Sequence, residues 1–214
     1  MRSRKKLLQE SKLYLILDAQ VNTHDELFDI ASQAVRGGVH IFQLRDKLSN
    51  AKDIMALSRK LVGLARRSNT LFILNDRPDL ALAVGADGVH LGQDDIPVSV
   101  AKKFLGYQFL IGKSCQNKKH LQQAQQECVD YVGFGSVYQT KTKPGRRPLN
   151  INNVAQVIAQ AKIPVFAIGG ISLKCCAELT AVGIKRMAVC RAISESENPK
   201  KETEQFIHLI NSRG

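Results

Sequence analysis

The chain has 214 residues, of which 44% are hydrophobic and 23% are charged, an ordinary globular composition. No apolar run approaches the roughly 20 residues that cross a bilayer, and the basic start MRSRKKLLQESK lacks the apolar core of a secretory signal. The net charge of +12 favours anionic partners. Because most basic residues are scattered, and neither zinc spacing nor an RNA-binding aromatic signature occurs, we expect phosphorylated small molecules rather than nucleic acid or membrane.

The five cysteines are an odd number and show no CxxC spacing. This pattern argues against a disulfide framework and fits a reducing compartment. We therefore expect a cytoplasmic protein.

Short apolar segments that suit buried parallel strands recur along the chain, and most end in polar residues or glycine. They are Leu13–Leu17, Val39–Leu44, Leu71–Leu74, Val89–Leu91, Phe109–Ser114, Tyr131–Val137, Ile163–Ile168 and Lys185–Ala192. Segments with helical periodicity or capping residues separate them. These run from the Thr23 cap to Val35, from Ser49 to Arg67, and over Pro78–Val84, Val98–Phe104, Lys118–Glu127, Ile151–Ala161, Ser172–Ala181 and Pro199–Ile210.

Strict alternation of strands and helices predicts a parallel sheet whose right-handed crossovers place the helices outside. Eight such repeats predict an α/β protein with a single (β/α)₈ barrel over residues 13–214. Residues 1–12 are expected to form a basic N-terminal extension that is frayed or packed on the surface. A doubly wound open sheet is the alternative, and the absence of GxGxxG after the first strand weighs against it.

In a barrel of this kind the functional site lies at the C-terminal ends of the strands. Here those ends carry mostly polar or charged residues, which core packing does not require. They are Arg45, Asp46, Lys47, Asn75, Asp76, Gln93, Asp94, Asp95, Ser114, Thr140, Thr142, Lys143, Gly169, Gly170 and Arg191.

Carboxylates follow two of these strands, at Asp76 and at Asp94–Asp95. Neighbouring parallel strands would bring both groups to one edge, where hard oxygen ligands favour Mg²⁺. The alternative is that Asp76 caps the next helix and that Asp94 and Asp95 begin a turn.

Three segments suit phosphate groups. The side chains of Arg45 and Lys47 leave their strand on the same side. The forked guanidinium group of Arg45 and the compact ammonium group of Lys47 would both suit a diphosphate. The alternative is that either residue pairs with a nearby carboxylate. A long loop carries Thr140, Thr142 and Lys143, whose hydroxyls, backbone N–H groups and charge could bind phosphate. The alternative is that this loop is solvated and mobile and binds nothing. The IGGI segment at 168–171 lets phosphate approach a helix start, or forms a plain turn.

Taken together, these segments resemble the thiamine phosphate synthase family. The resemblance is carried by QLRDK (43–47), LNDRPDLALAVGADGVHLGQDD (74–95), IGKS (111–114), DYVGFGSVYQTKTK (130–143), PVFAIGGI (164–171) and VCRAI (189–193). It implies a (β/α)₈ transferase that joins hydroxymethylpyrimidine diphosphate to a thiazole phosphate. The products are thiamine phosphate and diphosphate, released in a dissociative, Mg²⁺-assisted substitution without a protein nucleophile.

The resemblance also implies roles for individual residues. Asp76 and Asp95 would hold the metal, and Arg45, Lys47, Ser114 and Lys143 would act in catalysis. The pyrimidine diphosphate would contact Gln43, Arg45, Lys47, Asn75 and Lys143, with Ser114 beside the pyrimidine. Thr140, Thr142 and Gly170 would take the thiazole phosphate. Further substrate contacts are expected at Leu44, Asp46, Lys141, Cys190 and Arg191.

The chain departs from the family pattern at several positions. Arg191 stands where a small or hydroxyl residue is usual, and it would either bind the thiazole phosphate or crowd it. Gln116 stands where a His is common, which argues against the related thiazole tautomerase. Ser136 and Gln139 replace residues that are often Pro. An active synthase is favoured because the diphosphate and metal residues are all present; a weakly catalytic, precursor-binding relative is the other alternative. His90, inside an apolar strand, is expected to be packed rather than catalytic.

Overall fold

A computed structural model describes residues 3–140, 145 and 147–212. Eight parallel strands form a closed barrel in sequence order, and β1 pairs with β8 as well as with β2. They are β1 Leu13–Asp18, β2 Ile41–Arg45, β3 Leu71–Asn75, β4 Gly88–Leu91, β5 Leu110–Cys115, β6 Tyr131–Phe134, β7 Val165–Ile168 and β8 Met187–Val189. The predicted (β/α)₈ barrel is confirmed, and closure between β1 and β8 excludes the open sheet.

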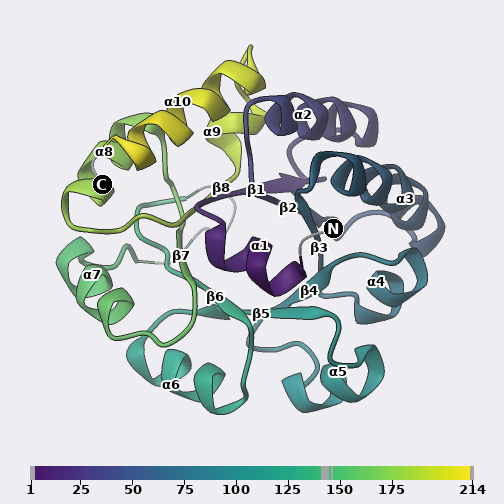
Figure 1. Cartoon of the computed structure of the whole chain (residues 1–214), viewed down its shortest axis with the longest axis horizontal. Helices are drawn as coiled ribbons and strands as arrows, with labels where there is room; N and C mark the ends of the chain where they lie inside the picture. Colours follow the sequence, from purple (N-terminus) through teal and green to yellow (C-terminus); the bar gives the residue numbers. More distant parts are fainter. Residues whose placement is uncertain (1–2, 141–144, 146, 213–214) are drawn as a thin grey trace.

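Helices surround the barrel in a single outer ring (Figure 1). They are α2 His24–Arg36, α3 Ala51–Ser68, α4 Pro78–Val84, α5 Val98–Leu105, α6 Lys118–Gln126, α7 Ile151–Ala159, α8 Leu173–Ala181 and α10 Pro199–Asn211. Two short helices, α1 Arg4–Glu10 and α9 Arg191–Ser194, are additional. Within the described residues, none of the helices combines the length and the apolar character needed to cross a membrane.

Local sequence signals explain several boundaries. Thr23 and Glu26 form a reciprocal capping box at the start of α2. Pro78 opens α4, and Gly85 ends it with a φ of 69°, a left-handed conformation that glycine adopts without strain. The prediction for the last strand was wrong at its end, because β8 stops at Val189 and Arg191 begins α9.

Two layers of buried side chains stabilise the barrel. The larger layer lies between the strands and the outer helices and includes Leu15, Phe42 and Leu44. The other fills the barrel interior and includes Tyr14, Tyr131 and Phe166. Successive strand residues therefore alternate between the layers, as the period of two requires.

Helix α1 closes the N-terminal end of the barrel, and Figure 1 shows it lying across the middle of the ring. Leu8 is 2% exposed and packs with the interior cluster. Arg4 Nε donates to Asp87 Oδ1 at 2.8 Å, and Arg186 Nη2 donates to the Gln9 carbonyl oxygen at 2.8 Å. Residues 4–10 thus form a helix that packs against the N-terminal end of the barrel.

We predict that Leu8→Ala lowers the free energy of unfolding by about 2–5 kcal/mol, since it leaves a cavity beneath the barrel floor. Chemical denaturation of this variant and of Gln9→Ala, whose side chain is exposed on the same helix, measures the effect. The control should change stability by less than about 0.5 kcal/mol. Equal, small losses in both variants would show that α1 does not seal the barrel.

Candidate functional site

A cavity of about 370 Å³ opens at the C-terminal ends of the strands. It brings together predicted residues from strands and loops far apart in the sequence. Of those predicted residues, the cavity is lined by Gln43, Arg45, Asn75, Ser114, Thr140, Gly170, Cys190 and Arg191. Lys141, Thr142 and Lys143 lie outside the described residues.

Arg45 is held in place by a carboxylate that the sequence analysis did not single out. Its Nη1 atom donates to both oxygens of Asp18, at 2.9 and 2.8 Å, and to Gln20 Oε1 at 2.9 Å. The Asp18 side chain is fully buried. A buried ion pair mainly fixes geometry, and all three bonds use the same nitrogen. Within the described part of the chain, the rest of the guanidinium group remains available to an anion in the cavity.

Asp76 and Asp95 lie beside this cationic edge, with their carboxyl groups within hydrogen-bonding distance of each other. Lys47 Nζ is 2.7 Å from Asp76 Oδ2. Asp95 Oδ2 also accepts a hydrogen bond from the Gly92 backbone N–H at 2.6 Å. The predicted convergence of the two carboxylates is therefore present in the structure.

The backbone also argues against a capping role for Asp76. Asp76 has a left-handed φ of 57°, and its N–H donates to the His90 carbonyl oxygen at 2.9 Å. The cap position of α4 is Arg77, which makes no side-chain cap bond. Asp94, the remaining acidic candidate, is exposed.

The two carboxyl groups differ in acidity because they share one small space. Burial opposes ionisation of Asp76, but the hydrogen bond with Asp95 and the Lys47 ammonium group lower its pKa overall. Burial raises the pKa of Asp95, and the neighbouring Asp76 raises it further. A divalent cation would relieve this repulsion.

The donor set fits Mg²⁺ in particular. Across the residues with described positions, no group of three or more His, Cys, Asp or Glu side chains could hold a metal ion. Two carboxylates are nevertheless sufficient for Mg²⁺, which retains water and takes phosphate oxygens as further ligands.

The loop after β6 and the 168–171 turn after β7, both predicted to bind phosphate, lie against each other on the side of the cavity away from Asp76 and Asp95. Tyr138 N–H donates to the Gly169 carbonyl oxygen at 2.9 Å, which joins the loop after β6 to the loop after β7. Gly170 has a φ of 64°, and a Cβ atom there would lie 2.3 Å from the Gln139 carbonyl oxygen. Only a glycine fits this close backbone approach.

Arg191 enters the same part of the cavity from α9 and forms an ion pair with Glu195. Its Nε atom is buried and has no hydrogen-bond partner among the residues described. A buried donor of this kind is costly unless a ligand satisfies it. Burial raises the pKa of the neighbouring Cys190 thiol to about 12, so this thiol stays protonated at neutral pH.

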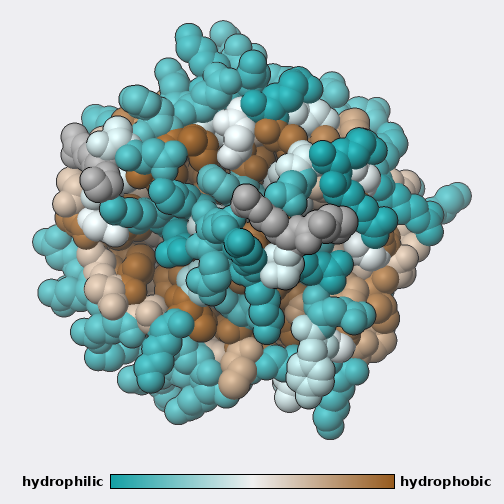
Figure 2. Space-filling view, in the orientation of Figure 1, coloured by the Kyte–Doolittle hydropathy of each residue, from teal (hydrophilic) through white to brown (hydrophobic). Residues whose placement is uncertain are grey.

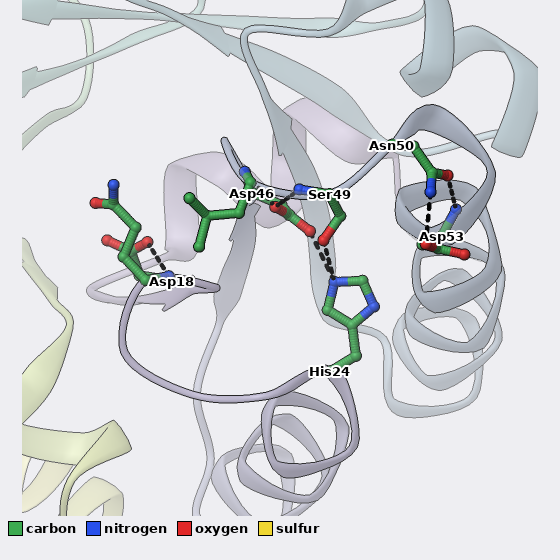
Figure 3. A network of polar contacts seen from close by, with 8 residues as sticks. Asp18, His24, Asp46, Ser49, Asn50 and Asp53 are labelled. Carbon is green, nitrogen blue, oxygen red and sulfur yellow. Dashed lines mark hydrogen bonds and ion pairs between the residues drawn. The ribbon is translucent and has the colours of Figure 1, made fainter.

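Two predicted substrate contacts point elsewhere. Leu44 belongs to the layer between the strands and the outer helices. Asp46 turns toward α2, where Oδ2 lies 2.7 Å from His24 Nε2, and Oδ1 accepts from the N–H groups of Leu48 and Ser49 at 2.9 Å (Figure 3). The Asp46 side chain therefore shapes the loop that carries Lys47.

Three interior side chains were missed or undervalued by the sequence analysis. Tyr14, Tyr131 and His90 all line the cavity. His90 is buried, as expected for a packed residue, but its Nε2 atom lies 3.0 Å from Ser114 Oγ. The sequence pattern that could have identified these residues is a polar side chain at a position of an apolar strand that faces the barrel axis.

The molecular surface in Figure 2 is predominantly hydrophilic over the face shown, with apolar side chains visible in patches between the polar ones. The cavity, by contrast, concentrates a few charges at the strand ends, where a low-dielectric wall strengthens their effect.

Comparison with known proteins gives a consistent result. A family model described as "Thiamine monophosphate synthase" matches residues 13–193. The thiamine-phosphate synthase of Nostoc punctiforme is 41% identical over 208 residues, and that of Gloeobacter violaceus is 40% identical over 204 residues. These alignments cover 97% and 95% of this chain but 58% and 59% of the relatives, so the chain spans about three-fifths of their length.

Solved structures agree with the sequence relatives. A thiamine phosphate pyrophosphorylase from Pyrococcus furiosus superposes with a TM-score of 0.87 at 31% identity, and the match covers 98% of both chains. A 3-hexulose-6-phosphate synthase from Salmonella typhimurium has a TM-score of 0.70 at 17% identity, which shows the shared barrel fold alone.

The buried position of Asp46 predicts a pH dependence of stability. Burial alone would raise its pKa, but hydrogen bonds from the Ser49 and Leu48 N–H groups and from His24 lower it overall. A carboxyl group with a lowered pKa stabilises the folded state above its unfolded pKa, and this stabilisation is lost as the pH falls.

We therefore expect wild type to be more stable than Asp46→Asn at pH 7 and to lose this advantage below about pH 4. Denaturant unfolding from pH 3 to 7 tests this, with Asp25→Asn at an exposed aspartate of α2 as the control. A stability difference between wild type and Asp46→Asn that stays constant with pH would contradict the assignment.

Proposed function

The chain belongs to the thiamine monophosphate synthase family, and from this premise we propose that it acts as a thiamine phosphate synthase. It would join 4-amino-2-methyl-5-hydroxymethylpyrimidine diphosphate to a thiazole phosphate, releasing diphosphate. The observation that best supports this proposal is the contact of Lys47, Asp76 and Asp95 after strands β2, β3 and β4, next to the cavity wall that Arg45 and Asn75 line. Such a set of cations and paired carboxylates suits a magnesium-bound diphosphate.

We assign the diphosphate to the Arg45 side of the cavity. Asp18 fixes the guanidinium group, so its remaining N–H groups are already oriented toward an anion. Lys47, half exposed and paired with Asp76, would turn from Asp76 to phosphate oxygens, and Asn75 lines the cavity wall. Lys143 joins this set on the strength of the family resemblance.

Asp76 and Asp95 would hold Mg²⁺. When bound, the ion neutralises charge on the diphosphate and makes it a better leaving group. The protein's own contribution is to place two hard oxygen ligands beside Arg45 and Lys47, where charge develops as the carbon–oxygen bond breaks.

The pyrimidine would occupy the aromatic floor of the cavity, formed by Tyr14, Tyr131 and Phe166. Loss of diphosphate leaves a methylene cation that the electron-rich aminopyrimidine stabilises. The thiazole nitrogen then forms the new carbon–nitrogen bond, so no protein nucleophile is needed. Enclosure by the barrel excludes water that would otherwise capture the cation, and orientation of the two substrates supplies much of the rate.

The thiazole phosphate would bind on the opposite side, between Thr140 and the Gly169–Gly170 turn. These segments are joined by backbone hydrogen bonds and present a close-packed backbone surface to the cavity. Arg191 would supply a charge there, and its Nε atom, which has no hydrogen-bond partner among the described residues, supports a role as a ligand rather than an obstacle. Thr142 is included from the resemblance.

The alternatives are less well supported. A thiazole tautomerase would not need the Arg45, Lys47, Asp76 and Asp95 set, and Gln116 occupies the position where the resemblance associates a His with that activity. A weakly catalytic, precursor-binding relative is less favoured because the similar proteins of known name are synthases. We also propose a cytoplasmic location and small-molecule partners, which the five free cysteines and the concentrated cavity charges support.

Removal of one metal-binding carboxylate should abolish turnover without unfolding the protein. We expect Asp76→Asn to lower kcat/KM by about 100-fold or more, because metal-stabilised charge on the leaving group is lost. Formation of thiamine phosphate from both substrates, followed across a Mg²⁺ titration, is the measurement.

Asp79→Asn is the matched control, since Asp79 lies on the same loop–helix segment but pairs with Arg77 at the surface. Undiminished, Mg²⁺-dependent turnover in Asp76→Asn would refute the metal assignment.

Arg191→Ala should raise the KM for the thiazole phosphate by about tenfold, because a charge-assisted contact is lost. The KM for the pyrimidine diphosphate should change far less, since Arg45, which is assigned to the diphosphate, keeps its own ion pair with Asp18. Lys174→Ala, which removes the same charge from the surface of α8, should change neither value. A fall in the thiazole KM would instead show that Arg191 crowds the site.

A further inference from the structure

A continuous chain of hydrogen bonds crosses the barrel interior beneath the cavity. Gln43 Nε2 donates to the Tyr14 hydroxyl at 2.7 Å, and the Tyr14 and Tyr131 hydroxyls are 2.9 Å apart. The Tyr131 hydroxyl lies 3.3 Å from His90 Nδ1, and His90 Nε2 lies 3.0 Å from Ser114 Oγ. These hydrogen bonds therefore link Gln43 on β2 to Ser114 on β5, the two residues assigned to the pyrimidine.

Tight packing fixes the positions of Tyr14 and Tyr131 in the middle of this hydrogen-bond network. The Phe166 ring meets the rings of Tyr14 and Tyr131 edge-on, with centroids 5.4 and 5.9 Å away. A Cβ atom at Gly112 would lie 2.1 Å from Tyr131 Cζ, so this glycine provides the space for the ring. Burial raises the pKa of both tyrosines, which keeps both hydroxyl protons in place at neutral pH.

With Gln43 Nε2 as the donor, the other hydrogen bonds of the network take one direction. Tyr14 accepts from Gln43, so its own proton is used best if it points to Tyr131; the opposite choice would leave that buried proton without a partner among the described residues. Tyr131 then donates to His90 Nδ1. In this direction His90 Nδ1 accepts and its Nε2–H donates to Ser114, so that the Ser114 proton can be donated to a ligand.

The same direction fixes the face that Gln43 presents to the cavity. With Nε2 turned to Tyr14, the amide offers its oxygen as an acceptor together with its second N–H as a donor. An amide of this orientation pairs with an amino group next to a ring nitrogen, as glutamine does with adenine. If the amide flipped, the pattern would instead fit a ring that carries an oxo group beside a protonated nitrogen.

We propose that Tyr14, Tyr131 and His90 are positioning residues that set the orientation of the Gln43 amide, so that the site accepts a 4-aminopyrimidine and rejects its 4-oxo analogue. This inference rests on the proposed function for the identity of the pyrimidine. It adds to that function a determinant of specificity that lies in the hydrogen-bond direction of three side chains.

The test compares the free hydroxymethyl 4-aminopyrimidine with its 4-oxo analogue, each bound in the presence of Mg²⁺ and inorganic diphosphate. Calorimetry on wild type should show a clear preference for the amino compound. In Tyr14→Phe the preference should fall by about tenfold or more, since the amide can then flip. Tyr131→Phe should give a smaller fall, because Tyr14 still contacts Gln43.

Binding of Mg²⁺-diphosphate alone should be the same in wild type and both variants, which shows that the diphosphate end is intact. Tyr107→Phe makes the same chemical change at a 95% exposed side chain and should alter nothing. Kinetic discrimination between the two pyrimidine diphosphates should follow the binding preference in each variant.

An unchanged amino preference in both Tyr14→Phe and Tyr131→Phe, with thermal unfolding showing folded protein, would overturn the inference. So would a loss of affinity that is equal for the two pyrimidines, which is the signature of a purely structural role. Absence of synthase turnover in wild type would instead count against the proposed function, while the binding preference would still decide between the two readings of Gln43.

Discussion

The mutual repulsion of Asp76 and Asp95 is the constraint around which the charged half of the site is arranged. Two carboxyl groups within hydrogen-bonding distance are unfavourable as a doubly charged pair, and the protein compensates with Lys47 and with a raised pKa at Asp95. A magnesium ion would take over this compensation and release Lys47 for the diphosphate. Arg45 differs from Lys47 because it is largely buried and pairs with fully buried Asp18, whereas Lys47 is half exposed where it pairs with Asp76.

The barrel supplies the two conditions that this chemistry requires. Parallel strands collect the polar ends of β2, β3 and β5 at one edge, although these residues are far apart in the chain. At the other end α1 closes the interior with Leu8, so the aromatic floor is shielded from that side. A cation formed above this floor would therefore meet the second substrate rather than bulk water.

Sequence reasoning predicted the features that short-range patterns determine. The bounds of α4 at Pro78–Val84 follow from proline at its start and Gly85 after its end. The polar residues after the strands were found because a parallel barrel places them together. The end of β8 was misplaced because the apolar pattern continues past Val189 into α9. Helix α1 was missed because only Leu7 and Leu8 are apolar in a basic segment, and their partners lie elsewhere in the chain.

The hydrogen-bond network inside the barrel could not be predicted from short-range patterns. Tyr14 and Tyr131 are separated by 117 positions, and their contact depends on barrel closure and on the space left by Gly112. Asp18 likewise looks like any polar residue at the end of a strand until its contact with Arg45 is seen. Such contacts depend on the packing of distant segments, which periodicity does not encode.

In the proposed site, Asp76, Asp95 and a diphosphate bind one divalent ion together. Electron paramagnetic resonance with Mn²⁺ in place of Mg²⁺ tests this most directly. We predict tight Mn²⁺ binding only when diphosphate is present, with a hyperfine coupling from ³¹P in the bound state. Tight Mn²⁺ binding without any phosphorus coupling, or a fully hydrated ion in the presence of diphosphate, would contradict it.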